Sequence, residues 1–502
     1  MAILERTSTR RRRPGVSSDH RHYKWWALSC TSLGMLMATV NSGTLIIALP
    51  TLESSLHTSL LELVWVILAY MIASTVLVLS AGRLSDLFGR KHAFAAGFAV
   101  FALASLGAGF AGNGTELIIW RIIQGVGGAF LFANATAIVT DAFPATQLGV
   151  AMGTNVMVAA VGLVLGPVLG GVLVSISWQW VFWFNVPCSI AGAAWALVVL
   201  RDTSGRDAVR GLDPLGTLTF LVGFTGLVLA ISRGGLTGWN DAVVIGGFAV
   251  AIVLLPLFVY VEAHQRAPML DLSLFRDRLF AAAAGAAFLN GLSRFALMFV
   301  FVFYFQGAQG DSALTAGLKL TPLAVGMLIA SPIAGVIADR RGSRTLAALG
   351  MAVSAAALAA MTTLEVTTPF LQSGLWLFVV GCGSGMFNSP NTAAMMGSVR
   401  AVRRGIAAGA RLLVQNAGAV ISIAFVMAVV TAAIPTEVLF KIFSGGAQGL
   451  TANQLTPFIS NMHLALWILA VVSLLGAGVS LLRPSHVVPG DPFTSGALKG
   501  SA

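Results

Sequence analysis

The chain has 502 residues, of which 57% are hydrophobic and only 10% are charged, and its mean hydropathy is +0.87. This number of charged residues is too small to cover the surface of a water-soluble protein. The composition therefore excludes a soluble globular protein and indicates a chain folded in lipid. Lysine and arginine outnumber aspartate and glutamate 30 to 19, but they occur in small groups between apolar segments, which argues against a nucleic-acid-binding face.

A basic segment precedes the first apolar stretch. Residues 1–25 include Arg6, four consecutive arginines at 10–13, Arg21 and Lys24, and the apolar stretch follows at 25–50. This stretch is too long for a signal-peptide core and has no cleavage site of small residues, so we expect an uncleaved first helix whose amino end is cytoplasmic. The arginines can instead bind anionic lipid, by the same electrostatics in a stronger form.

Apolar stretches long enough to cross a hydrocarbon core of about 30 Å recur along the chain. Alternating the sides from a cytoplasmic start places nearly all arginine-rich loops inside, with Arg233 and Lys441 outside and Lys319 at a margin. We therefore expect an all-α polytopic protein of the bacterial inner membrane, with fourteen transmembrane helices and both termini cytoplasmic. The predicted spans are 26–50, 63–81, 94–112, 117–140, 151–174, 180–200, 214–232, 242–262, 279–305, 315–338, 346–364, 371–395, 406–432 and 462–482.

Two loops repeat one pattern of glycine, aspartate and basic residues. The glycines permit a tight reversal, and Asp86 can pair with Arg90 or face the positive amino end of a helix; an ordinary structural turn is the alternative. The first copy has Gly82, Arg83, Asp86, Gly89, Arg90 and Lys91, and the second has Gly335, Asp339, Arg340, Gly342 and Arg344.

This internal repeat predicts a duplicated, 6+2+6 architecture. Two six-helix bundles, 26–200 and 279–482, flank an inserted helix pair with its cytoplasmic linkers at 201–278. The binding cavity is expected between the bundles. The polar tail at 483–502 is expected to be disordered, and the loop at 433–461, rich in Gly, Thr, Ser and Gln, to be mobile.

The fourth span carries an arginine at membrane depth, Arg121, followed by Gln124. An arginine in a lipid-buried helix is costly, so we expect it to face a cavity or a partner. An arginine that reaches back to the outer surface as an anchor is the alternative.

The fifth span contains closely spaced small residues and a proline. Glycines at intervals of three and four let another helix backbone approach, and a proline frees a carbonyl and bends the helix. A general helix-packing seam needs the glycines but not the Gly-Pro pair. The pattern consists of Gly162, Gly166, Pro167, Gly170 and Gly171.

Taken together, these segments resemble the fourteen-helix drug:proton antiporter family of the major facilitator superfamily. The first loop is similar to that superfamily's signature loop, which is thought to latch the two halves, and Arg121 stands at the arginine tied to proton coupling. The fifth-span pattern resembles a motif of exporters. Further similar stretches are 65–70, 177–180 with 185–187, and 268–278. The resemblance implies multidrug efflux by a major facilitator fold.

At one position the sequence departs from this family. Asn41 stands upstream of Ala48-Leu49-Pro50, where the family usually carries an aspartate. An amide cannot release a proton, so the role of that acid does not transfer. No carboxylate is apparent at mid-membrane depth in the other spans, which leaves Asp86, Asp141 or Asp339 as proton carriers.

Two arginines, Arg294 and Arg411, are predicted at depth in the second half. Such residues should line water or bind a negative group. Together with Asn41 and Gln415 they are predicted to line a cavity for an anionic or zwitterionic amphiphile, since guanidinium groups bind carboxylate and phosphate well. Alternatively, Arg294 pairs with asparagine and backbone carbonyls for structure alone, and Arg411 is an anchor or a latch.

These features predict a monomeric secondary active exporter that moves a small drug-like or lipid-like amphiphile out of the cytoplasm by alternating access, coupled to protons. Alternatives are a proton-independent carrier of an anionic lipid-like metabolite and a non-transporting sensor or assembly factor. No nucleotide-binding Gly-Lys-Ser/Thr loop, zinc-spaced His/Cys set or Gly-x-Ser-x-Gly elbow occurs in the sequence, so we expect no enzyme, cofactor or metal. Cys30, Cys188 and Cys382 are expected to be buried small hydrophobic residues.

Overall fold

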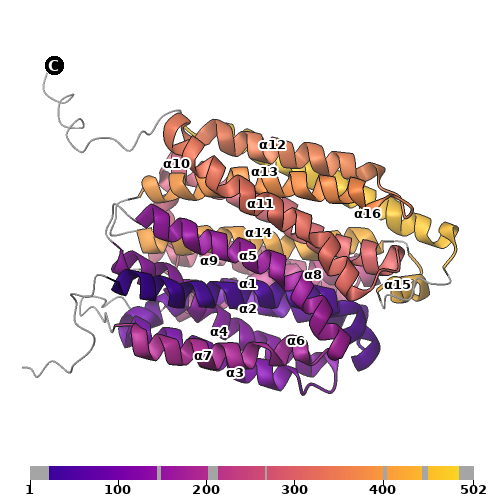
Figure 1. Cartoon of the computed structure of the whole chain (residues 1–502), viewed down its shortest axis with the longest axis horizontal. Coiled ribbons are helices and arrows are strands. Elements are labelled where there is room, and N and C mark those ends of the chain that lie inside the picture. The colour runs from indigo at the N-terminus through magenta and orange to yellow at the C-terminus, as the bar shows by residue number, and fades with distance from the viewer. Residues whose placement is uncertain are drawn as a thin grey trace, which may run out of the picture.

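The computed structural model describes residues 22–143, 148–201, 213–265, 268–399, 404–432, 434–443 and 450–484, and the regular elements within these ranges are all helices. The long helices lie side by side along the long axis of the molecule (Figure 1). In the first half and the insert they are α1 (Tyr23–Leu56), α2 (Leu60–Phe88), α3 (Arg90–Ala108), α4 (Gly114–Ala142), α5 (Leu148–Ile176), α6 (Trp180–Trp183), α7 (Asn185–Val199), α8 (Pro214–Thr237) and α9 (Ala242–His264). The remainder are η2 (Leu272–Arg276), α10 (Arg278–Val302), η3 (Phe303–Ala308), α11 (Ala313–Arg341), α12 (Ser343–Ala360), η4 (Met361–Thr363), α13 (Phe370–Gly397), α14 (Arg404–Thr431), α15 (Thr436–Phe443) and α16 (Ala452–Leu481).

Each predicted span overlies a helix of the structure, which confirms the all-α polytopic fold class. Among the described residues, 13 helices are long and apolar enough to cross a membrane. Helix α5, which has 29 residues, is not one of these 13 helices; its part Leu165–Ile176 counts as a shorter apolar helix. The count of fourteen spans stays a prediction.

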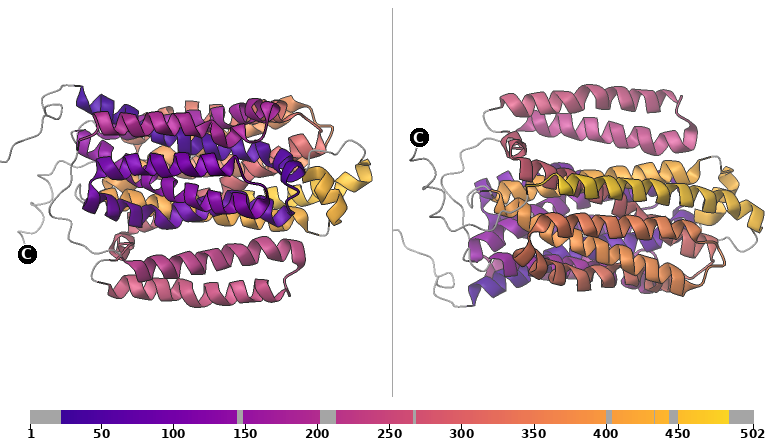
Figure 2. Two further views of the ribbon diagram at one scale, coloured as in Figure 1. Left: turned by 90° about the horizontal axis from the view of Figure 1, so that it is seen from below. Right: turned by 90° about the horizontal axis from the view of Figure 1, so that it is seen from above.

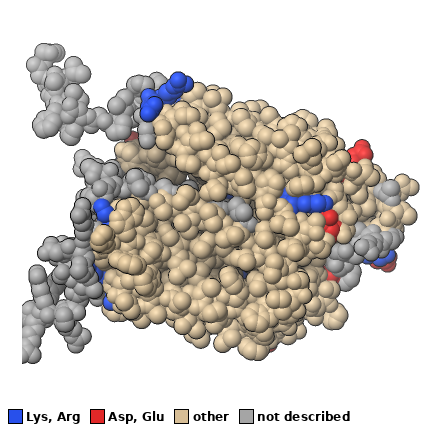
Figure 3. All heavy atoms as spheres, in the orientation of Figure 1, with Lys and Arg blue, Asp and Glu red and all other residues tan. Residues whose placement is uncertain are grey.

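The ends of the long helices gather in two sets. We call the set with the start of α1, the two repeated turns and the end of α16 the basic end (left in Figure 1), and the other set the opposite end. Between the two ends, Figure 3 shows a broad band of the surface almost without charged side chains, as expected of a surface in contact with lipid. The assignment of the basic end to the cytoplasm stays a prediction.

The inserted helices α8 and α9 form a hairpin beside the main body (Figure 2). Helix α8 packs on α2 and α14 of the body: Trp65 of α2 donates from Nε1 to Ser232 Oγ at 3.3 Å, and Gly235 lies against the backbone of Ala428 in α14. At the hairpin turn, hydrogen bonds from Arg233 hold the pKa of Asp241 below its usual range.

The two repeated turns share one backbone geometry. Gly89 has φ = 94° and Gly342 has φ = 86°, and the amide of each closes its preceding helix on the carbonyl four residues back. Only glycine enters this region without steric cost. The shared geometry fits the predicted duplication.

Alanine at Gly89 is therefore expected to destabilise the fold by about 1–2 kcal/mol, because Cβ disfavours a positive φ. Thermal unfolding of the purified protein in detergent measures this as a lower Tm. Gly478→Ala is the matched control, since an added Cβ there meets nothing within 4 Å. Equal Tm values for the two variants would contradict the conformational argument.

Two segments differ from expectation near the carboxyl end. Inside the loop expected to be mobile, α15 forms an amphipathic helix that buries Leu439 and Ile442 and exposes Glu437, and α16 begins ten residues before the predicted span. At the start of the expected tail, Arg483 is buried, at 2% exposure. Residues 1–21, 433, 444–449 and 485–502 lie outside the described residues.

Candidate functional site

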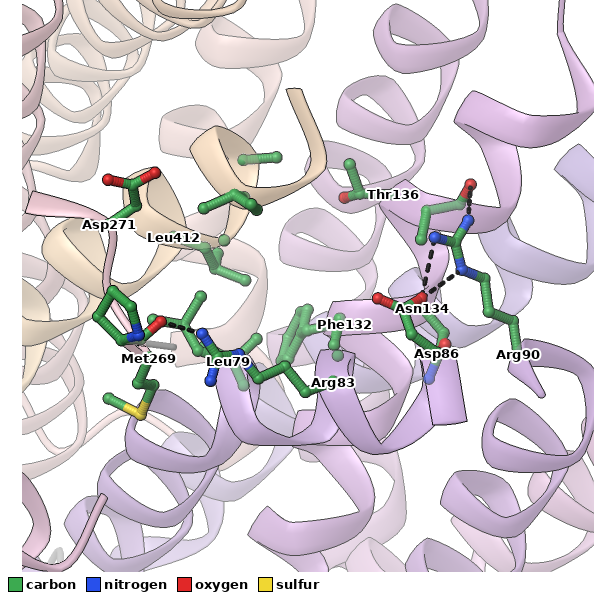
Figure 4. Close-up of a pocket in the computed structure, with 18 residues that line it drawn as sticks. Leu79, Arg83, Asp86, Arg90, Phe132, Asn134, Thr136, Met269, Asp271 and Leu412 are labelled. Atoms are coloured by element: carbon green, nitrogen blue, oxygen red, sulfur yellow. Dashed lines mark hydrogen bonds and ion pairs between the residues drawn. The ribbon is translucent and has the colours of Figure 1, made fainter. Parts of the chain in front are cut away.

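Arg90 joins three helices at the basic end (Figure 4). Its Nε donates to Asp86 Oδ1 at 2.9 Å, and its Nη1 donates to the carbonyl of Ala137 at 3.3 Å. Nη1 also donates to Asp141 Oδ2 at 2.5 Å. The cation therefore ties the end of α2 to the end of α4 from the start of α3. Of the two partners predicted for Asp86, the structure shows Arg90.

Beside this cluster a pocket of about 330 Å³ separates α2 and α4 from α14 and from the segment before η2. Arg83 crosses it and donates to the carbonyl of Pro268 (Figure 4). Gly82 lines the pocket, where an added Cβ would lie 3.7 Å from Ala133. Lys91 is half-buried at the start of α3. The loop thus reaches from the first half to the linker that precedes the second half.

The second copy of the loop is more exposed. Arg340 is exposed at the end of α11, and Arg344 is half-buried in the first turn of α12. The backbone of Asp339 belongs to α11, and its side chain lies outside what the structure describes.

Arg121 is 1% exposed and lies inside the first six helices. Its Nε donates to the carbonyl of Val66 at 2.9 Å, its Nη1 donates to Gln124, and its guanidinium carbon lies 4.4 Å from the ring centre of Tyr70. Because it is fully buried, it is no surface anchor. It binds α2 to α4, and the ring of Tyr70 supplies cation–π stabilisation.

Gln124 continues this contact into a polar network. Its Nε2 donates to Ser105 Oγ at 2.7 Å and to Asn41 Oδ1 at 3.3 Å, and Asn185 Nδ2 donates to the same Asn41 oxygen at 3.3 Å. Asn41 is 1% exposed. It was predicted to line the cavity between the halves, but the structure places it among α3, α4 and α7, inside the first half.

The glycines of α5 make two seams. Built Cβ atoms on Gly162, Gly166 and Gly170 would lie 2.0–2.9 Å from Thr39, Gly43 and Thr44 of α1. On another side of α5, a Cβ on Gly171 would lie 2.5 Å from the Cα of Leu314, and one on Gly317 would lie 2.3 Å from the carbonyl oxygen of Pro167. The first seam lies within the first half, and the second joins it to α11 at the opposite end.

Arg294 is 9% exposed in α10. Its guanidinium lies over the ring of Phe295 at 4.4 Å and 4.0 Å from the sulfur of Met327, and its Nε has no hydrogen-bond partner among the described residues. The pairing with asparagine and carbonyls weighed for it is not seen in this part of the chain. Arg294 is therefore a buried cation with an unused hydrogen-bond donor, Nε.

Arg411 begins a chain of hydrogen bonds in the second half. It donates from Nη1 to Gln415 Oε1 at 3.0 Å, and Gln415 Nε2 donates to Asn388 Oδ1 at 3.0 Å. Arg411 is half-buried, whereas Gln415 is buried. The chain connects α14 to α13, so the structure brings these two predicted residues together.

The sequence analysis missed several buried ionisable residues, among them Arg483, Glu53 and Glu262, the last of which is 2% exposed in α9. Arg483 donates to Asn391 Oδ1, and burial lowers the pKa of its guanidinium to about 10. Glu53 is 1% exposed in the last turn of α1, which continues six residues past Pro50, where the apolar run at 25–50 predicted the end of the helix. Within the described ranges, no group of three or more His, Cys, Asp and Glu residues is placed to hold a metal ion.

Comparisons with known proteins agree with this architecture. The family model of the Major Facilitator Superfamily matches residues 31–423 and 283–497. A tetracenomycin C resistance and export protein of Streptomyces glaucescens is 29% identical over 394 residues, which cover 78% of this chain and 73% of that protein. Multidrug resistance protein 3 of Bacillus subtilis is 31% identical over 429 residues, covering 84% and 83%.

The fold is also found in a solved structure. The crystal structure of the human organic anion transporter MFSD10 has a TM-score of 0.62 at 16% identity and covers 91% of this chain and 99% of that one. The family match, the multidrug and export relatives and the apolar helices confirm the predicted resemblance. This chain is a multi-pass transporter of the bacterial inner membrane and belongs to the Major Facilitator Superfamily, in line with that superfamily's drug-efflux branch.

Proposed function

We propose that this chain is a secondary active exporter that moves a small amphiphilic solute out of the cytoplasm by alternating access. Residues 26–200 and 279–482 act as the two moving halves, and 201–278 carries the insert. The observation that carries this proposal is the seam between α5 and α11, where Gly171 and Gly317 bring backbone against backbone. Such a contact has no interlocked side chains, so it can separate and re-form.

Two relatives support export as the direction. One is named for resistance and export of tetracenomycin C and the other for multidrug resistance. Two members of the α5 pattern that resembles a motif of exporters, Pro167 and Gly171, lie in the seam with α11. We therefore propose for this protein the same direction of transport, export, that the names of these relatives give.

The substrate proposed is an anionic or zwitterionic amphiphile. Arg294 is a buried guanidinium with an unused donor, and no carboxylate contacts it among the described residues. A bound carboxylate or phosphate would satisfy that donor and neutralise the charge. A lipophilic cation would be repelled by the same group.

Proton coupling is the proposed energy source, and it needs an acid other than the family's usual one. Asn41 is an amide inside the first half. Asp86 and Asp141 are both engaged by Arg90 at the basic end. These ion pairs join α2, α3 and α4 and suit a latch at the basic end.

Flux in proteoliposomes tests the proposal. An anionic, a zwitterionic and a cationic amphiphile of matched size are loaded with and without an imposed pH difference. We expect the anionic or zwitterionic solute to move at least tenfold faster than the cation, and the pH difference to accelerate it. Fast flux without a pH effect would indicate a proton-independent carrier, and no flux of any solute would indicate a sensor or assembly factor.

A further inference from the structure

Glu53 is a buried carboxylate that nothing in the transport scheme uses so far. It lies in the last turn of α1 at the opposite end and is 1% exposed. Neither of its oxygens has a hydrogen-bond partner in the described part of the chain. An ionised carboxylate buried in this way costs several kcal/mol. In this conformation burial therefore favours the protonated form of Glu53.

The position of Glu53 on α1 shows which contact buries it. Ser42, Ile46, Leu49 and Glu53 follow one another at intervals of three and four, so they share one face of the helix. Ser42 is half-buried, whereas Ile46, Leu49 and Glu53 are 8%, 0% and 1% exposed. This face of α1 is therefore more completely buried toward the opposite end.

The second half covers this face of α1. Helix α1 turns other faces to α5, which Gly43 contacts, and to α3, α4 and α7, toward which Asn41 lies, and it also contacts α2 and α6. At the opposite end α1 touches α10, α11 and α15, and Gln306 of η3 donates to the carbonyl of Ile47 at 3.2 Å. Glu53 is thus enclosed where the two halves meet, near the seam of α5 and α11. Separation of the halves at this end would expose it to water.

The other ionisable side chains at this end do not compensate Glu53. Those on the elements packed against α1 have partners of their own or lie exposed. They are Glu62 with Ser59 and Thr115, Glu116 with the amide of Gly112, Tyr304 with the carbonyl of Glu365, Lys319 with Asp311, and the exposed His57, Glu437 and Lys441.

We propose that Glu53 is a proton-operated gate: the two halves seal at the opposite end only when this carboxylate has taken one proton from water on that side. On opening, the exposed acid releases the proton to the same side and becomes a carboxylate. On closing, a proton from that water re-forms the O–H bond before the side chain is enclosed. Glu53 thus makes closure depend on pH at the opposite end without itself carrying a proton across.

This gate deepens the proposed function and rests on its alternating-access cycle. It also gives the pH dependence a sign. An exposed glutamate is ionised above about pH 4.3. Between that pH and the pKa of the enclosed carboxyl, each pH unit lowers the ratio of closed to open protein by up to about tenfold, because one proton is taken up on closure. Acid on this side favours the sealed state, and that state is lost as the pH rises.

The distance between spin labels on the two halves measures this ratio. Suitable sites are Phe110, just after α3, and Leu371, in the first turn of α13; they are 71% and 82% exposed, and both lie at the opposite end. Cysteines at these two positions carry nitroxides in full-length protein whose Cys30, Cys188 and Cys382 are replaced by alanine. Samples in lipid nanodiscs are compared between pH 5 and 8.

In the wild type we expect the long-distance population to grow with pH, with the ratio changing by up to about tenfold per unit. Glu53→Gln, which is neutral at every pH, should hold the ratio within about twofold across the range. Glu365→Gln removes an exposed glutamate at the same end and should behave as the wild type. A pH-independent wild type, or an undiminished response in Glu53→Gln, would overturn the gate. Flux is measured separately, so a missing flux with intact distance changes would refute export alone.

Discussion

Gly171→Ala is expected to slow transport roughly ten- to hundredfold while leaving the protein folded. The new Cβ would lie 2.5 Å from the Cα of Leu314 and 2.8 Å from its amide nitrogen. Both are backbone atoms, which cannot rotate away, so closing the seam between α5 and α11 would cost about 1–3 kcal/mol. This cost applies to the sealed state alone, so it shifts the equilibrium between the sealed and the open state roughly ten- to hundredfold toward the open state.

The same seam offers an independent variant in the other half. Gly317→Ala places its Cβ 2.3 Å from the carbonyl oxygen of Pro167, so it should produce the same loss of flux and the same shift toward the open form. The matched control is Gly246→Ala in α9, where an added Cβ meets nothing within 4 Å. Its flux should equal that of the wild type.

A second comparison separates movement from folding. Gly166→Ala would place a Cβ 2.9 Å from the Cα of Gly43, in the seam inside the first half. That seam is present in both states of the cycle, so this variant should lower Tm rather than change the ratio of states. If Gly171→Ala and Gly166→Ala gave the same loss of Tm and the same label distances, the α5–α11 contact would be a fixed interface and alternating access at this seam would be refuted.

The positions of the helices could be predicted well because lipid imposes both their length and their apolarity. The errors arose where a helix continues past its apolar run. The run of α1 stops at Pro50, a residue that often ends helices, but the helix extends to Leu56. The apolar pattern therefore places Glu53 outside the first span, whereas the structure buries it in the last turn of α1.

The rotation of each helix about its own axis is harder to predict from the sequence than its position along the chain. Asn41 and Gly43 are two residues apart, about 200° around the helix. Since Gly43 contacts Gly166 of α5, Asn41 must turn away from that side, and it bonds Gln124 and Asn185. Residue type and depth are visible in the sequence, whereas the rotation is set by packing against neighbouring helices. For the same reason the sequence does not show that Gly171 contacts Leu314, although it marks Gly171 as part of the glycine and proline pattern.

Arg294→Ala is expected to reduce flux of an anionic amphiphile roughly ten- to hundredfold and to leave the fold intact. A charge-assisted hydrogen bond contributes about 1.5–3 kcal/mol, so losing it weakens binding roughly ten- to hundredfold. The fold should tolerate the change because the guanidinium has no carboxylate partner among the described residues and its Nε is unsatisfied. Removing such a charge leaves no buried counter-ion behind.

Arg294→Met distinguishes the lost charge from a lost side chain, since it keeps most of the volume over Phe295 and beside Met327. It should match the alanine variant in flux and equal or exceed the wild type in Tm. Arg294→Lys keeps a positive charge and should retain part of the flux. Arg276→Met, which removes an exposed arginine in η2, is the control for the change in net charge and should transport normally.

The comparison of anionic and cationic solutes decides between binding and structure. A group that binds the substrate's negative charge should lose anion flux when neutralised, while flux of a matched cation stays equal or rises because repulsion is removed. A group that only supports the helices should lower Tm and reduce both fluxes alike. Normal anion flux in Arg294→Met would leave this buried cation without a role in recognition, and the proposed substrate charge would have to be abandoned.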